Sequence, residues 1–319
     1  MSWKRSLFFL FLLIAVASFY YFKVRQQYSA ETPFSFSTES AKMSVLSLAG
    51  QESVDHLTLR DTSKESEISF QKTKGHNWRI TRPVDYPAEF AIVDGFAALL
   101  KLSPRIRQFS TEGLSLSEFG FNAPRLSICI STNQRPNEKC LLIGSDAVAF
   151  KGAYAKWIDE SKYFLVDANF VAAFDKTLYS VRKKQVFLLT DQEISSVHFR
   201  SSEHEYEIKH QRKQWWLEKP LHAGVGIDAV NSILVYLSGI YVKEFLDTEL
   251  PEHQKFGLKQ PARIIEVTSR DGSKQTLIQG REAPGQDAYY AQGSDGRTVL
   301  LISFGKLNKL EDAFKALTS

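Results

Sequence analysis

The sequence predicts an α+β protein with an N-terminal transmembrane helix followed by two tandem repeats of a mostly antiparallel sheet with a packed helix. Three observations favour this architecture. An uncharged apolar segment opens the chain, alternating apolar strands bounded by turn residues fill the remainder, and one pattern of motifs occurs twice. With 319 residues, the chain is long enough for two domains of ordinary size.

The opening apolar segment runs from Ser6 to Phe22 and reads SLFFLFLLIAVASFYYF. Its length is at the lower end of what spans a hydrocarbon layer of about 30 Å. The small residues Ala15–Ala17 also resemble a signal-peptide cleavage site, so cleavage stays open as an alternative. The aromatic residues that continue the segment favour an uncleaved anchor. We therefore predict a single-pass bacterial inner-membrane protein with an anchor over residues 1–25, a tether over 26–43, and its C-terminal body on the periplasmic, exported side.

The charge balance argues against nucleic-acid binding. Four of the 40 basic residues flank the apolar segment, which leaves 36 basic and 36 acidic residues for the rest of the chain. A neutral body lacks the clustered positive charge that neutralises phosphates. We therefore expect no nucleic-acid partner.

The clearest organisational feature is an internal repeat. A strand from Trp78 that ends in Pro83 corresponds to a strand from Trp215 that ends in Pro220, at a constant offset (215 − 78 = 137). Apolar stripes of helical spacing follow both strands, over residues 90–100 and 227–237. The pattern predicts two copies of one sheet covered by an amphipathic helix.

Later motifs continue the match. Phe119-Gly120 corresponds to Phe256-Gly257 at the same offset, and each pair precedes a proline and an apolar strand. The returning strands end at Gly144 and Gly280, one residue closer (280 − 144 = 136). We match Ala153–Ala155 to Ala288–Tyr290. The first repeat is therefore placed at residues 44–178, the join at 179–184 and the second repeat at 185–319.

Two sites are candidates for covalent or contact chemistry. Cys129 and Cys140 lie on two expected hairpin strands, where a disulfide and two free thiols are both open alternatives, because a one-residue register change would separate the side chains. Trp216 alternates with the matched Trp215 and so belongs to the opposite face of its strand, which makes it the candidate for an exposed contact.

With these segments in view, the chain resembles the bacterial domain-of-unknown-function family 4340. The resemblance rests on the tryptophan strand ending in proline, a following helix, and an aromatic-Gly-Leu-x-x-Pro turn, of which Phe121 departs from the usual leucine. It covers most of the chain beyond the apolar segment. The resemblance implies an envelope protein associated with gliding-motility-type ABC transport systems, with transporter subunits as partners.

Motifs that carry catalysis or bind cofactors are missing from the sequence. The histidines His198, His204 and His210 lack zinc-ligand spacing, and Gly224–Ala229 fits a dinucleotide fingerprint only loosely because it does not follow a strand directly. We therefore expect no catalytic residues, no metal and no cofactor. The leading hypothesis is a membrane-anchored, non-catalytic scaffold or accessory subunit of an ABC-type transport system. The alternatives are a tethered small-molecule or glycan receptor that binds between the repeats, and a hydrolase with a dispersed site.

Overall fold

The computed structural model describes residues 43–110, 115–148, 150–189, 194–247 and 255–318. These residues form two compact units. One contains Gly95–Asp175 and the described residues up to Glu67, and the other contains Ile68–Asp94 and the described residues from Lys176 onward. The predicted anchor over 1–25 and all but the last residue of the predicted tether lie outside the described residues.

The first sheet has nine strands in the order β4-β3-β2-β1-β6-β7-β8-β9-β5. Their bounds are β1 Val54–Asp61, β2 Ser66–Lys72, β3 Trp78–Arg82, β4 Tyr86–Pro87, β5 Gln108–Ser110, β6 Leu126–Thr132, β7 Lys139–Asp146, β8 Gly152–Trp157 and β9 Lys162–Asp167. Three α-helices and a 3₁₀ helix accompany it: α2 Phe90–Leu102, α3 Ala168–Phe174, α4 Leu178–Val181 and η2 Leu116–Phe119.

The second sheet repeats the same order as β13-β12-β11-β10-β15-β16-β17-β18-β14. Its strands are β10 Ile194–Ser201, β11 Glu205–Gln211, β12 Gln214–Lys219, β13 Ala223–Val225, β14 Val242–Leu246, β15 Arg263–Ser269, β16 Lys274–Glu282, β17 Ala288–Gln292 and β18 Val299–Ser303. Its helices are α5 Ile227–Ser238 and α6 Phe304–Lys315. Two nine-stranded sheets with matching strand order confirm that the motif repeat reflects a repeated fold.

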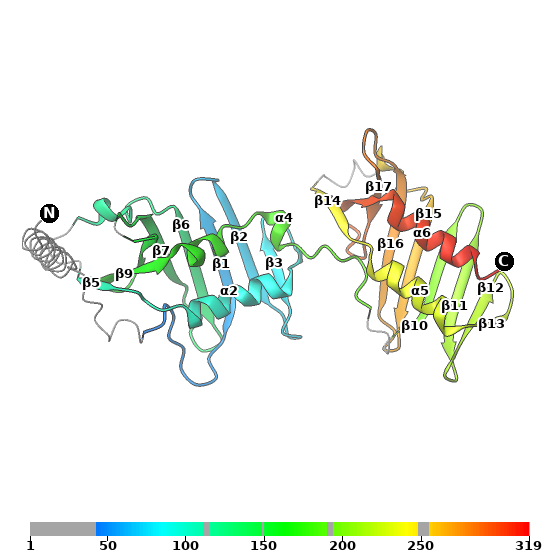
Figure 1. Cartoon of the computed structure of the whole chain (residues 1–319), viewed down its shortest axis with the longest axis horizontal. Helices are drawn as coiled ribbons and strands as arrows, with labels where there is room; N and C mark the ends of the chain where they lie inside the picture. Colours follow the sequence, from blue (N-terminus) through cyan, green and yellow to red (C-terminus); the bar gives the residue numbers. More distant parts are fainter. Residues whose placement is uncertain (1–42, 111–114, 149, 190–193, 248–254, 319) are drawn as a thin grey trace, which may run out of the picture. The chain divides into compact units, whose positions relative to one another are not determined.

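The core of each repeat lies between one face of the sheet and its helices. Helices α5 and α6 lie side by side on the second sheet (Figure 1). Alternate residues of the strands, such as Val197 and Phe199 on β10, are fully buried together with Ile233 of α5 and Phe314 of α6. Strands with one buried face alternate between apolar and polar residues, which is why the period-two signal was readable in the sequence.

The two tryptophans that mark the repeat are core residues. Trp78 is 2% exposed and Trp215 is 8% exposed, and Trp215 packs in the cluster beneath α5. The peptide bonds before Pro83 and Pro220, at the ends of these strands, are both cis. The motif thus has the same backbone form in both repeats.

One matched position is shifted by a residue. We aligned Tyr154 with Tyr289, but Tyr154 pairs with Leu165 across the β8–β9 ladder, and the corresponding pair in the second sheet is Tyr290 with Leu301. Tyr154 and Tyr290 also contact the matched residues Phe119 and Phe256, with ring centroids 4.9 Å and 4.5 Å apart. The structural match therefore keeps the offset of 136 that begins at Gly280.

The predicted fold class is right about the antiparallel sheets and incomplete about the helices. Every strand pairing within the described residues is antiparallel, and the architecture is mostly β. The second repeat packs two helices, α5 and α6, on its sheet rather than the single helix that the sequence pattern indicated. Each repeat ends in a helix after its last strand, α3 after β9 and α6 after β18, and α6 is the longer of the two.

The predicted localisation is corrected. Within the residues that the structure describes, no helix is both long and apolar enough to span a membrane. The single-pass inner-membrane placement with a periplasmic body rested on residues 6–22 alone, which lie outside that part of the chain, and the described structure gives it no support. The membrane placement was predicted from the length and hydropathy of that apolar segment.

Candidate functional site

Trp216 lies on the face of the second sheet opposite α5 and α6, which we call the helix-free face. Its neighbours Trp215 and Leu217 are buried in the core beneath α5, so alternation along β12 directs Trp216 the other way. The indole stacks on the His222 imidazole, with ring centroids 4.8 Å apart and planes 2° from parallel. His222 is in turn 3.2 Å from the Glu218 carboxylate. The ring of Trp216 is therefore held in one orientation at a half-buried position.

Exposed apolar side chains lie close to Trp216 in the chain. Leu221 is 49% exposed and Ile227 is 59% exposed, on either side of β13. A hollow of about 380 Å³ lies along this border of the sheet. Its lining consists of Lys213, Gln214, Trp215, Gly224, Val225, Gly226 and Ile227. Rigid aromatic residues with exposed apolar neighbours are the composition that protein-binding surfaces favour.

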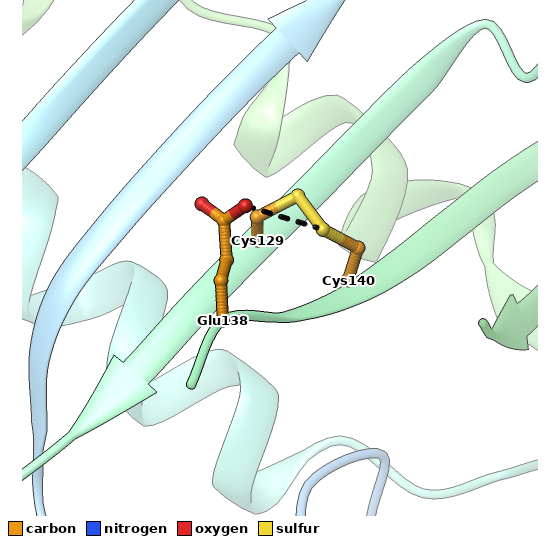
Figure 2. Close-up of side chains that lie close together, drawn as sticks. All are labelled: Cys129, Glu138 and Cys140. Carbon is orange, nitrogen blue, oxygen red and sulfur yellow. Dashed lines mark hydrogen bonds between the residues drawn. A yellow bond between two sulfur atoms is a disulfide. The ribbon is translucent and has the colours of Figure 1, made fainter. Parts of the chain in front are cut away.

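Cys129 and Cys140 form a disulfide with an S–S distance of 2.05 Å (Figure 2). The two residues face each other directly across the β6–β7 ladder. Cys129 is fully buried and Cys140 is half-buried. The strand register thus pairs the two cysteines, for which the sequence had left both a disulfide and two free thiols open.

Two charged groups border the disulfide. Arg60 Nη1 is 3.3 Å from Cys129 Sγ. On the other side of the bond, a Glu138 carboxylate oxygen is 3.9 Å from Cys140 Sγ, as Figure 2 shows. Glu138 and the two sulfurs lie within 4.8 Å of one another, a spacing that three metal ligands could share. Both sulfurs are occupied by their mutual bond, and thiolates, not disulfide sulfurs, are the sulfur ligands of zinc.

The second repeat contains the same hairpin without the disulfide. The pair across β15 and β16 that corresponds to Cys129 and Cys140 is Glu266 and Thr276. The neighbouring pairs match as well, because Ile128 faces Leu141 and Ile265 faces Leu277. The repeated fold therefore forms its central hairpin without a covalent link.

A cavity of about 250 Å³ lies within the unit formed by Ile68–Asp94 and the described residues from Lys176 onward. Its lining is Tyr86, Pro87, Lys183, Gln185, Val186, Leu188, Gln275, Gly293, Ser294, Asp295 and Leu300. Burial, reinforced by the Asp295 charge, raises the pKa of the Tyr86 hydroxyl to about 12. Burial also lowers the pKa of the Lys183 ammonium. Tyr86 therefore stays neutral near pH 7 and can act as a hydrogen-bonding group there.

Arg182 anchors the segment that leads into this cavity. Its side chain is only 2% exposed, and Nη2 donates to the Asp247 carboxylate at 2.7 Å. The guanidinium also lies over the rings of Phe245 and Tyr86, at 4.7 Å and 5.5 Å from their centroids. A planar cation that contacts two aromatic rings and one carboxylate is a stable arrangement for a buried arginine.

The pKa of the Glu52 carboxyl is strongly lowered, and Glu52 forms an ion pair with Arg135. Hydrogen bonds from Arg135 first and Thr132 second lower the pKa of Glu52 to about 2. The Arg135 Nη2 to Glu52 Oε2 distance is 2.6 Å, and the Glu52 side chain is 1% exposed. A carboxylate held permanently ionised is poorly matched to proton transfer near neutral pH.

The histidines on β10 and β11 are separated by the structure. His198 interacts with Glu205 at 2.9 Å and Glu266 at 3.5 Å, whereas the His210 imidazole is 3.2 Å from Arg270. Each is part of a polar network on the strands. Sequence reasoning did not identify Tyr86, Arg182 or Lys183, because nothing in their local pattern distinguishes them from loop residues.

The model of DUF4340, a domain of unknown function, matches residues 78–229 and again 215–318. No curated protein and no solved structure matches the chain. The two matched segments together span most of the chain and start at the two core tryptophans. The chain belongs to the DUF4340 family and carries the family's pattern in two tandem, overlapping segments.

Proposed function

We propose that this chain is a non-catalytic scaffold or accessory subunit that binds a protein partner at the border of its second sheet. The observation that carries the proposal is the stacked pair of Trp216 and His222 on the helix-free face. A tryptophan held in place by a neighbouring ring loses little conformational freedom on binding, and tryptophan is enriched among residues that dominate binding energy.

The surroundings of Trp216 support a protein partner rather than a carbohydrate. Leu221 and Ile227 add exposed apolar surface on either side of β13, the strand that pairs with β12, and Lys219 and Glu218 supply charges nearby in the chain. Protein interfaces combine an apolar centre with a polar rim in this way. The family resemblance makes the subunits of an ABC-type transport system the first partners to test.

The test is purification of the full-length tagged chain after crosslinking in cells, for the wild type and for Trp216→Ala. We expect one partner at near-stoichiometric amount with the wild type and a loss of at least tenfold with the variant, because removing an aromatic anchor costs more than about 1.4 kcal/mol. Equal recovery of the partner by both proteins, or recovery of the chain alone, would reject this proposal.

A second candidate function is small-molecule binding in the cavity beside Tyr86. Apolar walls from Val186 and Leu300, with Tyr86, Lys183 and Asp295 as polar groups, suit a small ligand with an apolar body and one polar end. Screening for a rise in melting temperature tests this candidate. A ligand that binds there should stabilise the wild type and Leu102→Trp, which alters an exposed leucine outside the cavity lining. It should not stabilise Leu188→Trp, which narrows the cavity.

A further inference from the structure

The outer edge of the first sheet is occupied by another segment of the chain. Glu89 N–H donates to the Val181 carbonyl at 2.7 Å, and Lys183 N–H donates to the Pro87 carbonyl at 3.0 Å. Ala88 and Arg182 form the antiparallel bridge between these two hydrogen bonds. Arg182 therefore forms a one-residue antiparallel bridge at the outer edge of the sheet, directly after α4 ends at Val181, and Val181 is fully buried.

The matching edge of the second sheet is β13. At the repeat offset of 137, Pro87, Ala88 and Glu89 correspond to Gly224, Val225 and Gly226. The following helix start also matches, since Val93 N–H donates to the Glu89 carbonyl at 3.2 Å and Val230 N–H donates to the Gly226 carbonyl at 3.3 Å. The backbone of residues 224–226 at the edge of the second sheet is thus equivalent to that of residues 87–89 at the edge of the first.

No strand covers β13 within the described ranges. It is the terminal strand of its sheet and pairs only with β12, through Trp215, Trp216 and Leu217. By alternation, the N–H of Gly226 and the carbonyl of Gly224 point away from β12, as their counterparts on Glu89 and Pro87 point toward residues 181–183. The hollow of about 380 Å³ lies at this edge and is lined by both glycines, Trp215 and Ile227.

We propose that β13 binds an extended segment of a partner protein by antiparallel strand addition, in the manner that β4 binds residues 181–183. The partner segment donates to the Gly224 carbonyl and accepts from the Gly226 N–H. An apolar side chain at the position of Val181 fills the hollow against Trp215 and Ile227. Strand addition obtains affinity from main-chain hydrogen bonds and specificity from pockets for alternate side chains. This inference rests on the proposed function and names how the partner is held.

Gly226 allows a sharp test. Its φ of −64° and ψ of 144° suit proline, and a Cβ there meets nothing within 4 Å. Gly226→Pro therefore removes the N–H donor while keeping the backbone conformation. Gly226→Ala is the matched control, because it adds a side-chain carbon and retains the donor. Circular dichroism and melting temperature should show that both variants are folded.

The probe is a fluorescently labelled synthetic peptide of residues 177–185 of this chain, which contains the segment that β4 binds. β4 is already occupied, so binding of added peptide to the full-length chain reports on β13. We expect the wild type and Gly226→Ala to bind alike and Gly226→Pro to bind roughly tenfold more weakly, and we expect peptide to protect the Gly226 amide of the wild type from hydrogen exchange. No binding to the wild type, or equal binding to all three proteins, would overturn strand addition.

Two further outcomes separate this inference from its alternatives. If sedimentation shows that the wild type self-associates and Gly226→Pro does not, the occupant of β13 is a second copy of this chain and the partner-segment proposal fails. If Trp216→Ala abolishes partner recovery from cells and Gly226→Pro has no effect on recovery or on peptide binding, the proposed function stands and strand addition is rejected.

Discussion

A Cβ placed on Gly144 would lie 1.9 Å from the carbonyl oxygen of Phe119. In the second repeat, a Cβ on Gly280 would lie 2.0 Å from the carbonyl oxygen of Phe256. The Phe-Gly turn, whose Gly120 and Gly257 have φ of 76° and 75°, therefore rests directly on the returning strand in both repeats. This contact explains why a glycine occupies the same place on the returning strand in both repeats.

Gly144→Ala should destabilise the first repeat by about 3 kcal/mol, because the added carbon forces two backbone segments apart. Gly280→Ala should do the same in the second repeat. Chemical unfolding of the full chain measures both effects. Gly95→Ala in α2, where a Cβ meets nothing within 4 Å, is the control and should be neutral or stabilising by up to about 1 kcal/mol. Similar stability of all three variants would contradict the packing described.

Stability should fall in acid through Glu52. Its pKa is lowered to about 2 in the folded state by Arg135 and Thr132, below the ordinary value of 4.5. The ionised group therefore stabilises the fold fully above about pH 4.5, and this contribution is lost as pH falls toward 2. Urea unfolding of the wild type and Glu52→Gln between pH 7 and pH 2 measures it. The difference between the two proteins should shrink with acid, and a difference independent of pH would contradict the assignment.

Removing the disulfide should weaken the chain without abolishing its fold. The cysteines are 11 residues apart in sequence, a loop for which chain entropy gives about 2–3 kcal/mol. The second repeat forms the same hairpin with Glu266 facing Thr276, so the strands do not need the bond. A double variant, Cys129→Ala with Cys140→Ser, should therefore melt cooperatively at lower temperature. Complete loss of folded structure would show that the link is required.

The two adjacent tryptophans should respond differently to truncation. Trp215→Ala should cost about 3–5 kcal/mol, because this ring packs beneath α5 in the core. Trp216→Ala should cost about 1 kcal/mol or less, because its ring is half-buried on the helix-free face. Denaturant titration of both variants decides the matter. Equal losses would mean that Trp216 is a structural residue.

Much of the fold was predictable because local patterns agreed with the tertiary structure. Trp78 and Trp215 mark equivalent core positions, and the amphipathic stripes of α2 and α5 were found by their helical spacing. The match of Ala153–Ala155 was wrong by one residue. Ala-Tyr recurs at an offset of 135 and Tyr-Ala at an offset of 136, and only strand pairing distinguishes Tyr289 from Tyr290.

The candidate site was less accessible from sequence. Alternation placed Trp216 opposite Trp215, but its stacking on His222 depends on the turn between β12 and β13. The occupied edge at β4 depends on hydrogen bonds between residues about 90 positions apart in the chain, for which the residues give no local signal. Strand addition is made by backbone groups, and these are the same for every sequence.

The most direct test of the account is photo-crosslinking from the border of the second sheet in living cells. A photo-reactive amino acid replaces Leu221, an exposed residue between β12 and β13, in one protein, and Ile158, an exposed residue of the first repeat, in a second. The account predicts one defined crosslinked partner from position 221 and none from position 158, with the product lost when Trp216→Ala is added. Crosslinks of equal yield from both positions, or a product that survives Trp216→Ala, would contradict it.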